Sequence, residues 1–152
     1  TQWYDQLATL NPDEALNDAT WQAIFEVRQL VLKRLEEARE QGLIGSALES
    51  SVDIYCSPKI FATLSKLDDE LRFVMITSSA KVHALTQQQA SAEKFELADG
   101  EQIALSISKC EYKKCTRCWH LRADVGQHPE HPELCGRCIN NIEGDGEIRH
   151  YA

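Results

Sequence analysis

The spacing of apolar residues predicts a long helix near the start of the chain. Between Trp21 and Gln41, apolar side chains recur at steps of three and four, as one buried face of a helix requires. Thr20 is the expected N-cap, and Gly42 suits the position just beyond the last turn. Similar spacing predicts short helical segments over 3–10 and 12–18. The predicted buried face of the long helix consists of Ile24, Val27, Val31, Leu35 and Ala38.

The middle of the chain combines strand-like and helix-like patterns. Residues 50–56 alternate as a strand does, and Pro58 opens a predicted helix over 58–66. After a turn over 68–70, the nearly continuous apolar run 71–77 predicts a second, buried strand. Strand, helix and strand in this order predict a βαβ crossover with parallel strands. Residues 78–89 fit either a strand or an irregular segment.

A hairpin is predicted next. Residues 93–97 and 102–108 have strand patterns, and the pair Asp99-Gly100 between them is a common hairpin turn. Ile103, Leu105 and Ile107 alternate along the second strand, which leads directly into the cysteine-rich end of the chain. The cysteine-rich part is therefore expected to be attached to the sheet without a flexible linker.

Four cysteines have the spacing of a zinc site. Cys115 and Cys118 form one CxxC pair, and Cys135 and Cys138 form a second pair sixteen residues later. Zinc ribbons separate such pairs by about fifteen to twenty residues. Four thiolates complete the tetrahedral shell of Zn²⁺, so we expect one structural ion and no open position for substrate. Gly136, inside the second pair, is expected to adopt a positive φ.

Spacing alone leaves other uses of these cysteines open. Two disulfides or four reduced core thiols are alternatives, although no secretory signal is visible to accompany disulfides. A histidine could replace one cysteine, since His120, His128 and His131 lie between the two pairs. Cys56 and Cys110 are expected to be buried strand residues, with a ligand role for Cys110 as the alternative.

Together the patterns predict an α+β fold in three parts. Residues 1–45 would form N-terminal helices, and 46–108 a small mixed α/β junction with a short sheet. Residues 109–152 would form a four-cysteine, zinc-ribbon-like module. With 43% hydrophobic residues, the chain can bury a core.

The charge is distributed unevenly. The formal net charge of −8 belongs to residues 1–108, which contain nine Lys or Arg and seventeen Asp or Glu, whereas 109–152 contain seven of each. The acidity argues against general nucleic-acid binding by the whole chain but leaves the metal segment balanced. No apolar stretch approaches the roughly 20 residues of a membrane span. Six cysteines without a signal peptide predict a cytoplasmic protein, and the start at Thr1 suggests a piece of a longer one.

The segments around the cysteines resemble a known family. Residues 114–120 read Lys-Cys-Thr-Arg-Cys-Trp-His, 135–141 read Cys-Gly-Arg-Cys-Ile-Asn-Asn, and 144–147 read Gly-Asp-Gly-Glu. These segments, and Gly-Leu-Ile-Gly-Ser over 42–46, resemble the C-terminal end of bacterial isoleucyl-tRNA synthetases. The resemblance covers nearly the whole chain and is weakest over 57–100.

The resemblance implies a role in protein synthesis. It places 1–45 at the end of a helical anticodon-binding domain, followed by the junction and a C-terminal zinc module. The family activates isoleucine with ATP and transfers it to tRNA. Motifs like its HIGH and KMSKS signatures are absent from this sequence, so no catalytic residue is expected in it. The implied partners are tRNA of the isoleucine type, held near its anticodon loop, and the remaining domains of the synthetase.

Candidate RNA contacts lie in and beside the zinc module. Aromatic and imidazole rings can stack on splayed bases, and cations can bind phosphate. For Trp119 we favour a place in the small core beside the metal, and for Arg117 and Arg137 the alternative to RNA is neutralising thiolate charge. The candidates are Lys113, Lys114, Arg117, Trp119, His120, Arg122 and Arg137, with Tyr112 and Arg149 as further possibilities.

Two rival functions are weighed against this one. Formamidopyrimidine-type DNA glycosylases carry a zinc finger with similar CxxC spacing, but the upstream helix and junction are unlike theirs and the N-terminal proline is missing. A protein-binding zinc ribbon without nucleic acid would suit the net charge of −8.

Overall fold

The computed structural model describes residues 16–152, and its first element is the long helix α1 (Asp18–Glu40). The five residues of the predicted apolar face are all buried, and Gly42 has φ +73° just after the helix. The N-cap is Asn17, not Thr20: the Asn17 side-chain oxygen accepts from the backbone N–H of Thr20 at 3.0 Å and from its hydroxyl at 2.8 Å. Thr20 thus occupies the N3 position, whose N–H a capping side chain normally binds. The predicted segment 3–10 and most of 12–18 lie outside the described residues.

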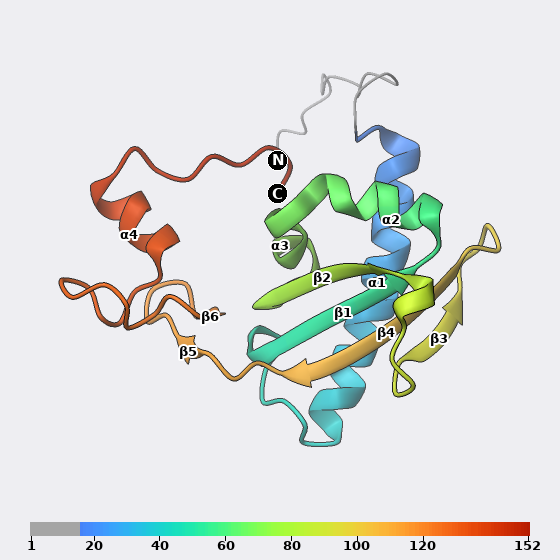
Figure 1. Ribbon diagram of the computed structural model, residues 1–152, viewed down its shortest axis with the longest axis horizontal. Helices are drawn as coiled ribbons and strands as arrows, with labels where there is room; N and C mark the ends of the chain where they lie inside the picture. The colour runs from blue at the N-terminus through green and yellow to red at the C-terminus, as the bar shows by residue number, and fades with distance from the viewer. Residues whose placement is uncertain (1–15) are drawn as a thin grey trace, which may run out of the picture.

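A four-stranded sheet with the order β2-β1-β4-β3 forms the centre of the fold (Figure 1). β1 (Ser50–Cys56) pairs in parallel with β2 (Ser79–Ala84) and antiparallel with β4 (Gln102–Lys109). β4 continues the predicted hairpin with β3 (Glu93–Glu96), and Gly100 in the turn has φ +81°. Side chains of α1 and of β1 and β4 share one buried apolar cluster, so α1 covers one face of the sheet.

The crossover from β1 to β2 consists of helical segments with a kink at Asp68, and the predicted strand over 71–77 is wrong. The connection consists of α2 (Pro58–Leu64), the 3-10 helix η2 (Ser65–Glu70) and α3 (Leu71–Met75). A short apolar run fits a buried helix as well as a buried strand, so its periodicity cannot decide between them. Here the Arg28 side chain of α1 donates to the Val74 carbonyl at 2.8 Å, and Ile76 at φ +58° ends α3. The parallel strand then follows at β2, in the segment whose pattern was undecided.

Short elements complete the sheet. The 3-10 helix η1 (Ala47–Glu49) leads into β1, and η3 (Leu85–Gln87) follows β2. On the sheet face opposite α1, Tyr55, Ala92 and Ala104 form a small buried cluster with Leu85 against it. Cys56 is buried in β1, as expected for a strand residue.

The cysteine-rich end forms a small module beside the sheet, and the rest of the described chain is called the body (Figure 1). It contains the two-stranded ribbon of β5 (Lys113–Lys114) and β6 (Leu121–Arg122), followed by α4 (Gly136–Glu143). Its own buried cluster comprises three cysteines with Val125 and Leu134, so few large apolar side chains hold it together. The helices, mixed sheet and four-cysteine module confirm the α+β class, whereas the domain boundaries at 45 and 108 stay a prediction. Within residues 16–152, no helix combines the length and apolarity needed to cross a bilayer.

Candidate metal centre and nucleic-acid interface

The four cysteines of the two CxxC pairs come together at one point. Cys115 and Cys118 lie in the loop between β5 and β6, Cys135 is the N-cap of α4, and Cys138 lies in its first turn. All four sulfur atoms lie within 4.8 Å of one another, and those of Cys118 and Cys135 are 3.7 Å apart. Thiolates about 2.3 Å from one Zn²⁺ in a tetrahedron lie about 3.8 Å apart. The arrangement therefore fits one zinc ion with a closed, structural shell.

Backbone donors favour ionised sulfur at Cys115. The Cys135 N–H donates to the Cys115 sulfur at 3.4 Å. Burial opposes ionisation of Cys115, but the N–H groups of Cys118, Cys135 and Arg117 lower the pKa of its thiol to about 6. Burial instead raises the pKa of the Cys138 thiol and raises that of Cys135 to about 12, so the backbone favours the thiolate, the form that binds Zn²⁺, at Cys115 and not at these two.

The tight turns differ from the prediction for Gly136. Gly136 has no positive φ, whereas Trp119, immediately after the first pair, has φ +68°. Gly136 begins α4, and a Cβ on it would lie 3.0 Å from the Asp124 carboxylate, which accepts the Gly136 N–H at 2.7 Å. The glycine therefore permits a close approach that tethers the second pair to the intervening loop.

The histidines lie outside the sulfur cluster. Within the described residues, the metal-binding group consists of the four cysteines alone. His131 pairs with Glu143 at 2.6 Å, and the nearest carboxylate oxygen of Asp124 is 4.0 Å from His128. Cys110 is buried, and its thiol donates to the Leu121 carbonyl at 3.8 Å. These contacts leave the tetrathiolate as the arrangement that the structure favours.

Comparisons with known proteins agree with this geometry. The family described as "Zinc finger found in FPG and IleRS" matches residues 113–141. The chain is 46% identical over 151 residues to the isoleucine–tRNA ligase of Cronobacter sakazakii, and 48% identical over 152 residues to that of Psychromonas ingrahamii. The alignments cover 99% and 100% of this chain. The chain is therefore similar, over nearly its whole length, to one part of isoleucine–tRNA ligases. It spans only 16% of the length of each of these ligases.

The cysteine module carries exposed basic and aromatic side chains beside the metal site. Lys113, Lys114 and Arg117 are exposed, and 59% of Trp119 is accessible to solvent. The expectation that Trp119 fills the core beside the metal is wrong, because its positive φ turns the chain so that the ring lies outside. The Lys114 ammonium lies 4.9 Å from the centre of this ring, within the range of a cation–π contact. We call these four residues the knuckle face.

The other three RNA candidates lie where the zinc module meets α3. His120 is 8% exposed, and its Nδ1 is 3.1 Å from the guanidinium of Arg72, itself 3% exposed. Burial and the neighbouring arginines lower the pKa of His120 to about 4, so at neutral pH it accepts the Arg72 hydrogen bond. Arg122 lies 3.5 Å from Asp69, and Arg137 pairs with Glu147 at 2.8 Å. His120 and Arg122 thus connect the module to the rest of the protein, whereas Glu147, the partner of Arg137, belongs to the module itself.

The centre of this junction was missed from the sequence. The guanidinium groups of Arg72 and Arg149 each lie 4.0 Å from the ring centre of Phe73, and that of Arg137 lies at 5.1 Å. Glu70 accepts hydrogen bonds from the backbone N–H groups of the last three residues, 150–152, at 2.6 to 2.9 Å. Because 71–77 was predicted as a strand, nothing in the pattern indicated that Arg72 and Phe73 face the zinc module.

Arg137 also acts on the metal cluster, as one of its two predicted roles requires. Burial disfavours its charged form, yet hydrogen bonding to the Cys118 thiol and attraction to Glu147 raise the pKa of Arg137. A positive group beside the sulfurs offsets the surplus negative charge of a tetrathiolate zinc site.

Proposed function

We propose that this chain is a tRNA-binding region of an isoleucine–tRNA ligase and holds the anticodon stem-loop of isoleucine tRNA. Catalysis, the ATP-dependent attachment of isoleucine, belongs in this proposal to the rest of the polypeptide. The closed sulfur shell supports a structural part for the metal, because it leaves no position for a reacting group.

The knuckle face is the observation on which the proposal depends. A large aromatic ring is ordinarily buried, but Trp119 is 59% exposed. The Lys114 side chain lies against its ring. Single-stranded bases stack on such rings, and cations beside them bind the phosphates. The metal fixes the backbone of the turn, so Trp119 is presented on a rigid support rather than on a mobile loop.

The local charge supports the same reading. Over 109–152 basic and acidic residues are equal in number, but Glu147 and Asp69 neutralise the arginines of the junction. Lys113, Lys114 and Arg117 stay exposed, and the Lys114 ammonium lies 4.9 Å from the ring centre of Trp119. An acidic chain can in this way carry one surface suited to RNA.

The proposal is tested by measuring tRNA affinity of the zinc-loaded chain with Trp119→Ala. Base stacking on an aromatic side chain contributes about 1–3 kcal/mol, so the dissociation constant should rise roughly 5- to 150-fold. The matched control is Phe25→Ala, which removes an aromatic ring that is 51% exposed on α1, far from the module. Equal affinities of the two variants would contradict the proposal.

Salt dependence and competing nucleic acid sharpen this test. Lys114→Ala should reduce the slope of log affinity against log salt by about 1, whereas Lys94→Ala on β3 should leave it unchanged. Because the matched zinc-finger family also includes FPG proteins, duplex DNA is the necessary competitor. Tighter binding of duplex DNA than of isoleucine tRNA would favour the glycosylase-like rival instead.

A further inference from the structure

The outer edge of β2 is an unused hydrogen-bonding edge. β2 is the outermost strand of the sheet, and in the described part of the chain only β1 pairs with it. The bonds from Cys110 N–H to the Glu49 carbonyl and from Ser57 N–H to the Gln102 carbonyl turn the odd-numbered residues of β1 toward β4, so Ser50, Val52 and Ile54 face β2. With Ser51 opposite Ser79, their partners are the peptide groups of Ser79, Lys81 and His83, and the peptide groups of Ala80 and Val82 face away from β1.

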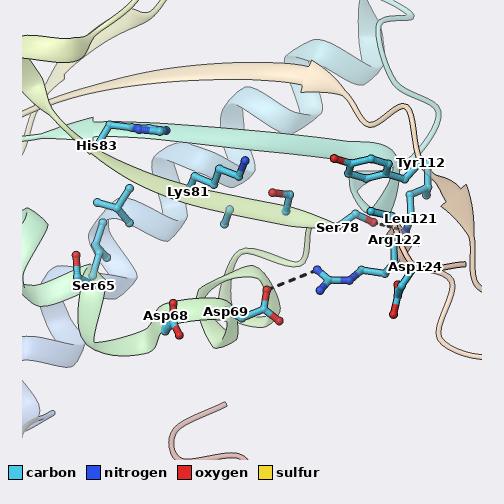
Figure 2. Close-up of a pocket in the computed structure, with 15 residues that line it drawn as sticks. Ser65, Asp68, Asp69, Ser78, Lys81, His83, Tyr112, Leu121, Arg122 and Asp124 are labelled. Carbon is cyan, nitrogen blue, oxygen red and sulfur yellow. Dashed lines mark hydrogen bonds and ion pairs between the residues drawn. The ribbon is translucent and has the colours of Figure 1, made fainter. Parts of the chain in front are cut away.

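A groove follows this edge. Its volume is about 720 Å³, and it is lined by every residue from 78 to 83. Figure 2 shows β2 along one side and the η2 segment with Asp68 and Asp69 along the other. At one end, Arg122 of the zinc module reaches Asp69 across 3.5 Å. Six strand residues span about 20 Å, so the groove has the proportions of an extended peptide rather than of a single base.

We propose that this groove accepts an extended polypeptide segment, added as a further strand to the free edge of β2, and that the segment comes from the remainder of a full-length ligase. Strand addition uses main-chain hydrogen bonds for affinity and alternate side chains for specificity. The matched ligases are far longer than this chain, which spans 16% of them, so such a segment is available at high effective concentration.

The charges along the groove favour a peptide over RNA. Three aspartates, Asp68, Asp69 and Asp124, line it against the two cations Lys81 and Arg122. Phosphate would meet a surplus of carboxylates here, unlike at the knuckle face. Asp68 is exposed on the wall opposite β2 and is held at φ +44°, a strained backbone for a residue other than glycine. The incoming strand is therefore expected to carry Lys or Arg opposite Asp68.

Amide hydrogen exchange compares the isolated chain with the same residues in a full-length ligase. The amides of Ala80 and Val82 should exchange about tenfold or more slowly in the full-length protein, since a new strand would bind them. The amides of the other edge strand, β3, are the internal control and should not change. Identical exchange along β2 in both proteins would overturn the proposal, and so would protection that arises only after tRNA is added.

Substitution of Ala80 tests the backbone pairing. Ala80→Pro removes an outward N–H while leaving the ladder to β1, and Pro is tolerated at such edge positions. In the full-length ligase it should abolish the protection of Val82, whereas Ala80→Ser, which keeps the N–H, should retain it. Slow exchange at Lys81 and His83, which face β1, verifies that the sheet is intact. Because tRNA binding by the knuckle face is measured separately, this inference can fail while the proposed function stands.

Discussion

Arg72 is the residue whose replacement best tests how the zinc module is held on the body. Its guanidinium donates to Asp69 at 2.9 Å and to His120 at 3.1 Å, and lies 4.0 Å from the ring centre of Phe73. Arg72→Met keeps most of the apolar stem and removes all three contacts. We expect the variant to fold, because α3 and the sheet keep their apolar packing, but to lose rigidity between the module and the body.

The magnitude follows from the burial of each contact. The Asp69 side chain is 62% exposed, so that ion pair contributes about 0–1 kcal/mol. The bond to His120 joins a charged donor to a buried acceptor and contributes about 1.5–3 kcal/mol, and the ring contact about 0.5–1 kcal/mol. Burial of the guanidinium, which lowers the pKa of Arg72, opposes these gains and is relieved by Met. The net destabilisation should be about 2 kcal/mol.

Chemical denaturation of the zinc-loaded chain measures this value, and a double-mutant cycle with His120→Leu isolates the buried bond. The coupling energy should be about 1–3 kcal/mol. Arg39→Met is the matched control, because Arg39 also pairs with a residue three positions away, Glu36, but with both side chains more than half exposed. A coupling below about 0.5 kcal/mol, or equal losses for Arg72 and Arg39, would refute the account of this junction.

Two further predictions concern the same end of the chain. Removal of zinc with a chelator should broaden or shift the NMR signals of residues 110–150 and weaken tRNA binding, while α1 and the sheet keep theirs; unchanged signals from 115 to 138 would contradict this. Partial burial opposes ionisation of Glu70, but the N–H groups of 150–152 lower its pKa. The hydrogen bonds from residues 150–152 to Glu70 should therefore be intact at neutral pH. They should be lost as the pH falls from about 4.3, the usual pKa of a glutamate in an unfolded chain, through the lowered pKa of Glu70 in the folded protein. Glu70→Gln should speed amide exchange at 150–152 at pH 7, whereas the exposed control Glu40→Gln should not; equal exchange in both variants would show that the carboxylate is not the anchor.

The sequence by itself determined the elements whose signals are local. The long helix α1, the β3–β4 hairpin and β1 follow from apolar periodicity and turn residues within each segment. The metal site follows in the same way, since two CxxC pairs carry their own geometry and zinc needs only four sulfurs in reach. Even the N-cap error was local, because Asn17 and Thr20 are both capping residues three positions apart.

Only the tertiary structure decided features that depend on distant partners. The run 71–77 is apolar enough for strand or helix, and its packing against α1 selected the helix. Trp119 was expected inside and lies outside, because a positive φ beside the knuckle directs the ring to solvent. Arg72 and His120 are 48 positions apart, and Glu70 and His150 are 80 apart. Which cations stay exposed and which are neutralised is set by such long-range pairs, and no local pattern records them.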